Sequence, residues 1–532
     1  MPSLIQRRTS ARRIREEAAE AQFLEPSPVH VDNGDEGRYP NRIGNFTKGL
    51  MHDPQTGEVV PSAYDAFLTA LRDPFPGAFD ELVKGNHLGC SEKAKRRRFV
   101  NPQAAFAFDL EGIDSHQLTM RAAPAFASAE EAGEMVELYW MSLLRDVTFA
   151  QYATNATAIN AAADLSQLSD FRGPKVGGQV TPQTLFRDPY PGCTMGPYVS
   201  QFLLQPVDFG AQSIDTRILT NAPGSDFAKT FPEWLKLING CQPGAEASIG
   251  AGPPVFCYNG RALAQYVHKD FLYQAYFVAC VNLLTNGYPA DAGNPYGRVI
   301  DPGAGLPLPV GSTGPLAEVG FGTFGGPFMA TLVTEPATRA LKHQWYQKWQ
   351  VHRRVRPEEF GGRVEAQRLN KATYPFHPDL LASTVLKAVQ GSFHSHLLAQ
   401  AFPEGSPMHT AYGSGHATVA GACVSMLKWF FDESTPVKSP VVPDPAHPGK
   451  LIPYVAPAGE PPLTVGGELN KLASNISQGR NIAGVHWRTD ASEANRLGEE
   501  LAISMLKELG GLFNESVGGN SLTRFDGTTI TI

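Results

Sequence analysis

Cysteine is scarce in this chain, with six residues among 532 and no CxxC pair. That density is far too low for a disulfide scaffold, so we expect reduced thiols. The cysteines stand at positions 90, 193, 241, 257, 280 and 423.

Long apolar runs are missing as well. No stretch reaches the roughly 18 consecutive apolar residues of a membrane-spanning helix, and the first residues lack the hydrophobic segment of a secretory signal. The sequence therefore predicts a soluble protein that has no cleaved leader and no membrane partner and is cytoplasmic by default.

A strong excess of positive charge is also absent. Lysine and arginine number 45 against 52 aspartate and glutamate residues, which gives a formal net charge of −7. The basic runs RRTSARRIR (7–15) and KAKRRR (93–98) are short, and such runs are usually solvated faces or interface contacts. We therefore expect no nucleic-acid partner.

Helical periodicity, by contrast, recurs along the chain, whereas strand-like alternation is scarce. The segment 128–147 begins with Ser128 and Glu131 at the spacing of a capping box and continues with apolar residues at helical intervals. Loops rich in Gly and Pro, at 287–315 and 433–467, separate such segments. Together these patterns favour an all-α helical-bundle architecture. Further helices are predicted at 261–285, 336–354, 379–401, 415–431, 468–482 and 491–509.

Composition divides the chain into four segments. Residues 1–60 are polar and turn-rich and are predicted to form an arm over the body or over another subunit, which suggests an oligomer. A helical region (61–335) precedes the region 336–515, which carries the three motifs below and has the proline-rich loop 433–467 as a surface insertion. Residues 516–532 form a C-terminal tail.

The first motif is the turn AYGSGHA (411–417), which leads into an apolar helix. Ser414 is a good N-cap, and Gly415 keeps side chains away from the helix start. The first backbone N–H groups have no intrahelical partners and the helix dipole is positive here, so a small oxyanion would fit. Taken alone, such a turn is more often only a helix start.

The second motif is KWQVHRRVRP (348–357). Lys348 and Arg356 are eight residues apart, about 80° around a helix, and Pro357 forces Arg356 toward an extended conformation. Both cations can then point into one pocket. The alternative, a basic helix end that interacts with the C-terminal dipole, is the commoner arrangement for such a stretch on its own.

The third motif is SQGRNIAGVHWRTD (477–490). Arg480 and His486 are six residues apart and would lie on different faces of a straight helix, but Gly484 can break the helix between them. Asp490 has a plain alternative role as the N-cap of the last helix. A histidine such as His486 is more often a packed or solvent-facing residue.

The three motifs together supply the groups that bind a tetrahedral oxyanion. Arginine and lysine neutralise its charge, a serine hydroxyl and a glycine N–H donate to its oxygens, and an imidazole bonds to its central atom. Each motif is weak alone, but the same chemistry appears three times.

These motifs resemble the signature motifs of the vanadium-dependent haloperoxidases, which share their pocket with type 2 phosphatidic acid phosphatases and bacterial class A acid phosphatases. The resemblance covers roughly residues 340–495, and the runs HRR, ATVAGA and GRNIAGVH look more like algal and cyanobacterial bromoperoxidases than fungal chloroperoxidases. It implies an all-α fold of two four-helix bundles and a homo-oligomer, between a dimer and the dodecamer of red-algal relatives. The stretch FVNPQAAFAFDLEG (99–112) lies outside the resemblance and carries no pattern that indicates chemistry.

The resemblance also implies a cofactor, vanadate, and a set of residues that hold it. Lys348, Arg356 and Arg480 match the cations that bind its oxygens. Ser414 and the Gly415 N–H match the neutral donors.

Three histidines match the family's remaining site residues. His486 matches the ligand to vanadium, and His416 matches the histidine that binds the apical oxygen and moves protons. His409 stands where bromoperoxidases have histidine, and we expect it to position halide or tune the protons with a pKa near its ordinary value. Trp345 stands where red-algal enzymes carry arginine, which leaves halide preference open, while Asp490 agrees with the family aspartate.

The reaction implied is oxidation of bromide by hydrogen peroxide to hypohalous acid, with iodide as a further candidate halide, and the hypohalous acid halogenates small organic substrates. Whether chloride is oxidised stays open. Some relatives carry structural calcium, but no EF-hand loop supports it here. Two alternatives remain: an acid phosphatase of the same superfamily with His486 as nucleophile and His416 as acid, and a non-catalytic helical assembly protein.

Overall fold

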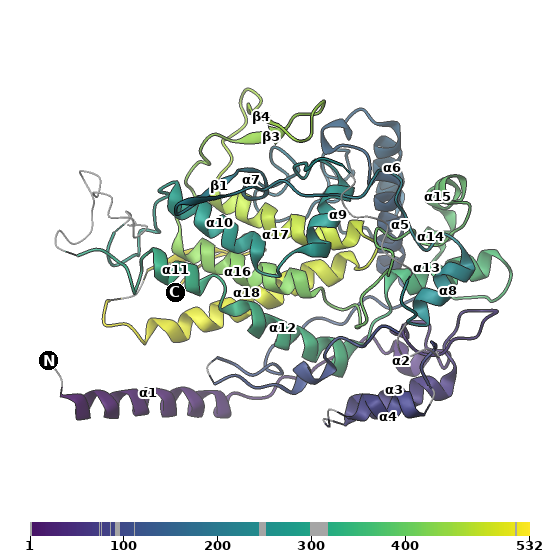
Figure 1. The fold of residues 1–532 in the computed structure, drawn as a ribbon, viewed down its shortest axis with the longest axis horizontal. Helices are drawn as coiled ribbons and strands as arrows, with labels where there is room; N and C mark the ends of the chain where they lie inside the picture. Colours follow the sequence, from purple (N-terminus) through teal and green to yellow (C-terminus); the bar gives the residue numbers. More distant parts are fainter. Residues whose placement is uncertain are drawn as a thin grey trace.

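The computed structural model describes residues 3–73, 75, 77–85, 87–90, 96–110, 112–243, 252–297, 318–516 and 519–532. Its described part is mostly helical, which confirms the predicted all-α class (Figure 1). The α-helices are α1 (Leu4–Leu24), α2 (Asp35–Arg38), α3 (Pro61–Arg72), α4 (Ala78–Lys84), α5 (Ala129–Leu144), α6 (Ala156–Gln167), α7 (Gln201–Leu204), α8 (Phe231–Ile238), α9 (Gly260–Lys269), α10 (Gln274–Thr285), α11 (Gly326–Leu332), α12 (Pro336–Tyr346), α13 (Pro357–Arg368), α14 (Pro378–Ala382), α15 (Val385–Phe393), α16 (Gly415–Phe430), α17 (Val465–Ile482) and α18 (Arg488–Gly510).

Shorter elements complete the fold. Antiparallel hairpins pair β1 (Val207–Phe209) with β2 (Gln212–Ile214), β3 (Val441–Pro443) with β4 (Leu451–Pro453), and β5 (Ser521–Thr523) with β6 (Thr529–Thr531). The 3-10 helices are η2 (Pro102–Phe106) and η3 (Phe149–Gln151), and η4 (Gln347–His352) is a π-helical turn.

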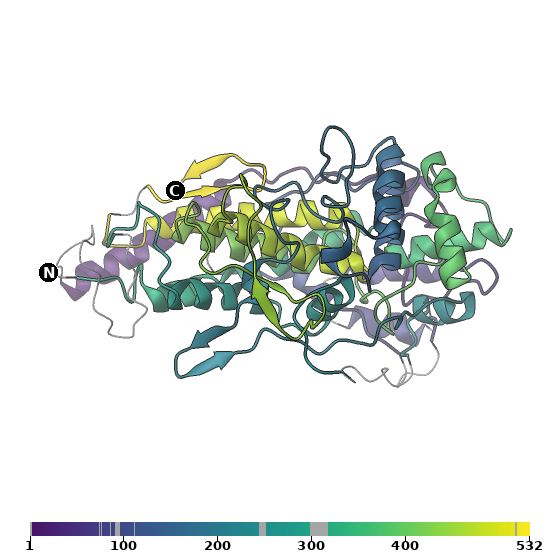
Figure 2. The same cartoon turned by 90° about the horizontal axis from the view of Figure 1, so that it is seen from above.

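Helix α16 lies at the centre of the molecule and packs against α12, α17 and α18 (Figures 1 and 2). Every residue of α16 except His416 is buried, because the helix is apolar on nearly all sides. Gly421 and Gly498 allow α16 and α18 to approach closely: a Cβ at Gly421 would lie 2.0 Å from the Asn495 carbonyl oxygen. The motif helix is therefore fixed rigidly in the core.

We predict that Gly421→Ala destabilises the protein, because its methyl group forces α16 and α18 apart. Overpacking of this kind costs about 1–3 kcal/mol, so the apparent Tm in a thermal unfolding scan should fall. Gly391→Ala in α15 is the matched control, since a Cβ there meets nothing within 4 Å; it should leave the Tm unchanged or raise it. An equal Tm for both variants would contradict the close packing.

A single large apolar core joins the central helices to α5, α6, α14 and α15, which lie together at one end of the molecule (Figure 1). A smaller cluster lies under α3 and α4 and includes the fully buried Trp349. The C-terminal residues pack against the core, with Leu522 and Phe525 buried.

The N-terminal segment differs from its prediction as a turn-rich arm. Residues Leu4–Leu24 form α1, because Ser3 and Gln6 make a reciprocal capping box ahead of a run rich in alanine, arginine and glutamate. None of its residues is buried. The side chain of Gln22 donates to Glu508 at 3.1 Å, and the helix otherwise extends along one edge of the molecule (Figures 1 and 2).

Three predicted helices are interrupted. The helix expected at 261–285 is two helices, α9 and α10, because Asp270 takes an extended conformation and pairs with His416. The helix expected at 379–401 breaks after α14, where the Ser383 hydroxyl and the Thr384 N–H bind Asp164, and it ends at Phe393. The helix expected at 336–354 turns π-helical at Gln347.

The other helix predictions are confirmed within three residues, as α5, α16, α17 and α18. Two capping predictions were wrong. Ser128 does accept from the Glu131 N–H at 3.1 Å, but the Glu131 carboxylate binds Arg354 instead of closing the box. Trp487, not Asp490, is the N-cap of α18; Asp490 is the third helical residue and accepts from the Trp487 N–H at 3.1 Å.

The loop 433–467 carries the exposed β3–β4 hairpin at the surface. Most of the predicted loop 287–315, and part of the basic run 93–98, lie outside the described residues. Within the part of the chain that is described, no helix is both long and apolar enough to cross a membrane.

Candidate active site

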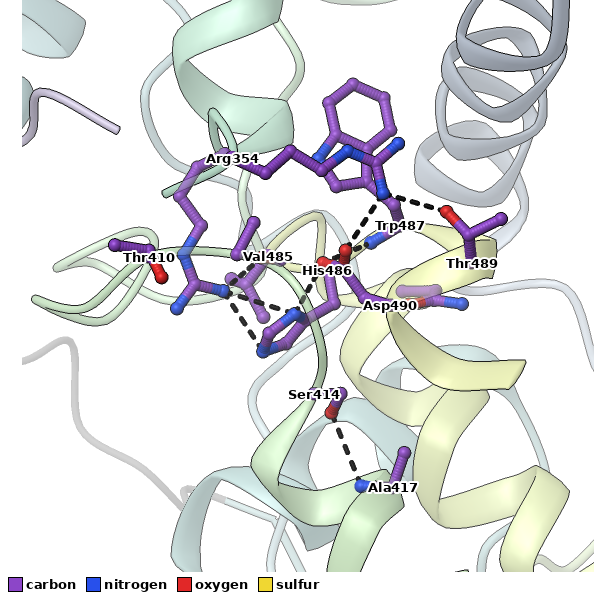
Figure 3. Close-up of polar contacts among 12 residues, drawn as sticks. Arg354, Thr410, Ser414, Ala417, Val485, His486, Trp487, Thr489 and Asp490 are labelled. Atoms are coloured by element: carbon purple, nitrogen blue, oxygen red, sulfur yellow. Dashed lines mark hydrogen bonds and ion pairs between the residues drawn. The ribbon is translucent and has the colours of Figure 1, made fainter. Parts of the chain in front are cut away.

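The N-terminus of α16 forms the floor of the site. Ser414 is its N-cap, fully buried, and the Ser414 oxygen accepts from the Ala417 N–H at 3.4 Å (Figure 3). That role leaves the hydroxyl proton available to a bound anion. A Cβ on Gly415 would lie 3.2 Å from the Trp345 ring, so glycine keeps the helix mouth open beside α12.

Three cations converge on this helix mouth from different elements. Lys348 lies in η4, Arg356 precedes α13, and Arg480 lies in the last turn of α17. Because η4 is π-helical, the angle of about 80° predicted between Lys348 and Arg356 for an α-helix does not apply. Arg356 is nevertheless extended before Pro357, with φ −80° and ψ 150°, as predicted.

The hydrogen bonds of these cations go mainly to neutral groups. Lys348 Nζ donates to the carbonyls of Thr410 at 2.7 Å and Ala411 at 3.0 Å. Arg356 donates to the Val485 carbonyl at 2.7 Å. Arg480 donates to the Val267 carbonyl at 2.8 Å, and its Nε is buried without a partner.

Burial lowers the pKa of each of these cations. It lowers the pKa of Lys348 well below its usual range, and the charge of Arg356 lowers it further. Burial also lowers the pKa of Arg356 to about 9 and that of Arg480 to about 10. Because an anion among these groups would favour their charged forms, the donor set fits a small oxyanion.

His486 lies beside Asp490 (Figure 3) and contacts Arg356 as well. Its Nδ1 is 2.7 Å from Asp490 Oδ2, and Arg356 Nη1 is 3.0 Å from its Nε2. Burial, followed by the charges of Arg356 and Lys348, lowers the pKa of His486 well below its usual range. The imidazole is therefore neutral: its Nδ1–H donates to Asp490, and Nε2, which accepts from Arg356, has the lone pair that can bind an electrophilic atom.

Asp490 is itself held by a buried network that the sequence did not reveal. Arg354 donates to Asp490 Oδ1 at 2.9 Å (Figure 3). It also binds Glu134 at 2.8 Å and Glu131. The arginine thus joins the α5 carboxylates to the His486 partner. Arg354 belongs to the quoted HRR run, but nothing in its spacing indicated these partners, which are more than 130 residues away in the chain.

His416 pairs with Asp270, a second residue that sequence reasoning missed. His416 Nε2 lies 3.1 Å from Asp270 Oδ1. Burial acts to raise the pKa of Asp270, but the neighbouring His416 outweighs it and the pKa is lowered overall. The carboxylate is therefore ionised and can stabilise a protonated His416.

His409 accepts a hydrogen bond from Arg356 through Nδ1 at 2.8 Å, and its ring contacts that of Trp345 with centroids 5.0 Å apart. The expectation of an ordinary pKa was wrong. Burial, then the charges of Lys348 and Arg356, lower the pKa of His409 well below its usual range. Nδ1 also lies 3.2 Å from the Thr410 carbonyl, but the closer guanidinium can only donate, so Nδ1 accepts and the neutral ring carries its proton on Nε2.

A cavity of about 770 Å³ opens over this floor and is lined by His409, Gly415, His416, Arg480 and His486. Ser414, Lys348 and Arg356 lie fully buried beside it, so the structure brings all eight predicted residues together. No pattern in the sequence indicated that the segment around η2 forms part of the cavity wall. Its other lining residues include Val100, Asn101, Gln103, Ala104, Ala107, Leu272, Leu341, Lys342, Trp345 and Pro407.

Among the described residues, no group of three or more His, Cys, Asp or Glu side chains is placed to hold a metal ion. The cavity combines one imidazole lone pair with a cationic cradle instead.

Comparison with known proteins gives consistent matches. Residues 336–515 match the family model described as the VCPO second helical-bundle domain. The chain is 34% identical to the vanadium-dependent bromoperoxidase of Corallina pilulifera, over 96% of this chain and 93% of that protein. It is 32% identical to the vanadium-dependent bromoperoxidase of Ascophyllum nodosum, over 90% of this chain and 84% of that protein.

A solved structure shows the same fold. It is the homohexameric structure of the second vanadate-dependent bromoperoxidase from Ascophyllum nodosum. The match has a TM-score of 0.89 and 29% sequence identity, and it covers 100% of this chain and 91% of that one.

Proposed function

The chain belongs to the vanadium-dependent bromoperoxidase family, whose enzymes oxidise bromide with hydrogen peroxide, and we propose that the cavity above α16 is where it binds vanadate and carries out this reaction. The observation that supports the proposal is the buried cluster of Lys348, Arg356 and Arg480 around a neutral His486. The overall reaction converts bromide, hydrogen peroxide and one proton into hypobromous acid and water. Hypobromous acid then brominates small organic molecules.

Each group around the helix mouth has a part in holding the cofactor. The three cations neutralise the oxyanion charge, and Ser414 and the Gly415 N–H donate to its oxygens. His486 Nε2 binds the vanadium atom, and Asp490 fixes the tautomer that makes this possible. When bound, vanadate supplies a Lewis acid at which hydrogen peroxide becomes a two-electron oxidant.

His416 handles the peroxide proton. It lines the cavity, and the ionised Asp270 beside it stabilises the imidazolium that forms when His416 accepts that proton. Lys348, next to the helix mouth, stabilises negative charge that develops on oxygen as bromide is oxidised. His409 presents a neutral N–H to the cavity, a donor suited to binding a halide ion.

We also propose that the protein forms a homo-oligomer. The related Ascophyllum enzyme is homohexameric. An isolated helix of 21 residues with no buried residue, as α1 is here, gains little from tertiary packing, and such a helix is a good subunit contact.

The decisive experiment is bromination of monochlorodimedone by metal-free protein before and after addition of orthovanadate. Activity should appear only when vanadate, hydrogen peroxide and bromide are present together. Hydrolysis of para-nitrophenyl phosphate by the same metal-free sample tests the acid phosphatase alternative, in which His486 attacks phosphorus. Phosphate-ester hydrolysis without vanadate-dependent bromination would overturn the proposal, and inactivity in both assays would leave the non-catalytic alternative.

A further inference from the structure

A second histidine–carboxylate pair lies on the wall of the cavity, apart from His416 and Asp270. His268 Nε2 is 2.6 Å from Glu404 Oε1, and both residues line the cavity. His268 is in the last turn of α9, whereas Glu404 is in the loop that leads to the helix-mouth motif. None of the cofactor-binding roles proposed above uses this pair.

The pair is held in a fixed geometry. The His268 ring stacks on Phe402 with centroids 3.8 Å apart and an interplanar angle of 9°. The backbone carbonyl of Glu404 accepts from Lys48 at 3.0 Å and from Arg97 at 2.9 Å. The side chains retain 11% and 21% exposure for His268 and Glu404, so protons can reach the pair from solvent.

Glu404 is the ionised partner of the pair. Although burial acts to raise the pKa of Glu404, the hydrogen bond and charge of His268 lower it to about 2, so the carboxylate is ionised throughout the neutral range. The ionised carboxylate and the negative end of the α9 dipole therefore both present negative charge to the His268 ring. Among the described residues, the charged or titratable groups that contact the pair or share its cavity include Lys48, Arg97, Asp270, Lys342, His409, His416, Arg480 and His486.

Bromide oxidation consumes one proton more than peroxide supplies. After His416 has accepted one peroxide proton, the O–O bond breaks, an O–Br bond forms and bromide loses two electrons. The other peroxide oxygen leaves as water after gaining two protons, of which His416 returns one and solvent must supply the second. We propose that His268 and Glu404 form a proton-delivery pair, in which His268 donates this proton into the cavity and is reprotonated from solvent beside Glu404. This inference rests on the proposed function.

The test compares His268→Ala and Glu404→Gln with the wild-type enzyme loaded with vanadate, over pH 5 to 9. We expect kcat of His268→Ala to fall by about tenfold or more at alkaline pH, the low end of general acid–base effects. The loss should shrink at acidic pH, where solvent protons are abundant. Added imidazole should restore part of the rate, and the Kd for vanadate should stay within about twofold of wild type.

Glu404→Gln keeps the His268 ring and a hydrogen-bonding group but removes the charge that stabilises the imidazolium. We expect the alkaline fall of kcat to move to lower pH. His447→Ala is the control, because His447 pairs with Asp444 at 3.2 Å on the exposed β3–β4 loop, away from the cavity; it should behave as wild type, with no response to imidazole.

Two outcomes would overturn the proton-delivery role. One is an unchanged pH profile of kcat in both variants. The other is a loss of rate in His268→Ala that imidazole does not restore, together with a wild-type pH profile in Glu404→Gln. If His268→Ala does not fold, the Glu404→Gln profile decides alone. Failure of the wild type to brominate would instead overturn the proposed function, so the two failures are distinguishable.

Discussion

His486→Ala should lose vanadate binding and, with it, more than about 10³-fold of the bromination rate, of the order seen when a group essential to catalysis is removed. The substitution removes the Nε2 lone pair, which is the group in the cavity placed to bond the central atom. It also leaves Asp490 without its 2.7 Å partner and Arg356 without its 3.0 Å contact. Vanadate retained after gel filtration, measured by elemental analysis, gives the binding result, and monochlorodimedone bromination gives the rate.

The cations remain in this variant, so weak electrostatic retention of phosphate is expected even when vanadate is lost. Circular dichroism and the apparent Tm establish that the variant is folded. His447→Ala, a histidine substitution at an exposed site, should bind vanadate and brominate as the wild type does. Full bromination by His486→Ala would show that the ligand has been assigned to the wrong residue.

The sequence predicted residues that the structure brings together at the helix mouth, because this part of the site depends on local rules. Ser414 caps α16 by contacting a residue three positions later, and Pro357 makes Arg356 extended. Gly484 has φ +85° and ends the preceding helix, so His486 turns toward the cations instead of continuing along α17. Short-range signals of this kind can be read from one stretch of chain.

The partners that tune the cradle could not be predicted in the same way. Asp270 is 146 residues from His416, and Glu134 is 220 residues from Arg354. Their contacts depend on how α9 and α5 pack against the central helices, and the hydrophobic periodicity of the sequence does not predict that packing. The ordinary pKa expected for His409 failed for the same reason, since its shift comes from burial among distant cations.

The interruptions in the predicted helices also result from contacts between residues that are distant in the chain. Asp270 leaves helical geometry where it meets His416, and residues 383 and 384 leave it where they bind Asp164. Local propensity favours continuing the helix in both places, and a tertiary hydrogen bond to a carboxylate or imidazole prevails. The first of these breaks is also what places a carboxylate beside the cavity.

His416→Ala should separate cofactor binding from turnover. The cradle of Lys348, Arg356, Arg480 and His486 stays intact, so vanadate should still bind, with a Kd raised by about tenfold, the loss of one charge-assisted hydrogen bond. Bromination should fall by about 10²- to 10⁴-fold, because no group then accepts the peroxide proton. Elemental analysis of bound vanadium, together with kcat from the bromination assay, measures both effects.

Asp270→Asn tests whether the carboxylate acts through His416 as a positioning residue. Its pKa is lowered beside His416, so the carboxylate is ionised across the working range and the variant removes a full negative charge. We expect vanadate affinity near that of wild type, a lower kcat, and a shifted pH profile, because a neutral amide no longer stabilises the protonated imidazole. If Asp270→Asn loses the same fraction of its rate at every pH, Asp270 has only a structural role. If His416→Ala brominates at the wild-type rate, His416 does not transfer the peroxide proton.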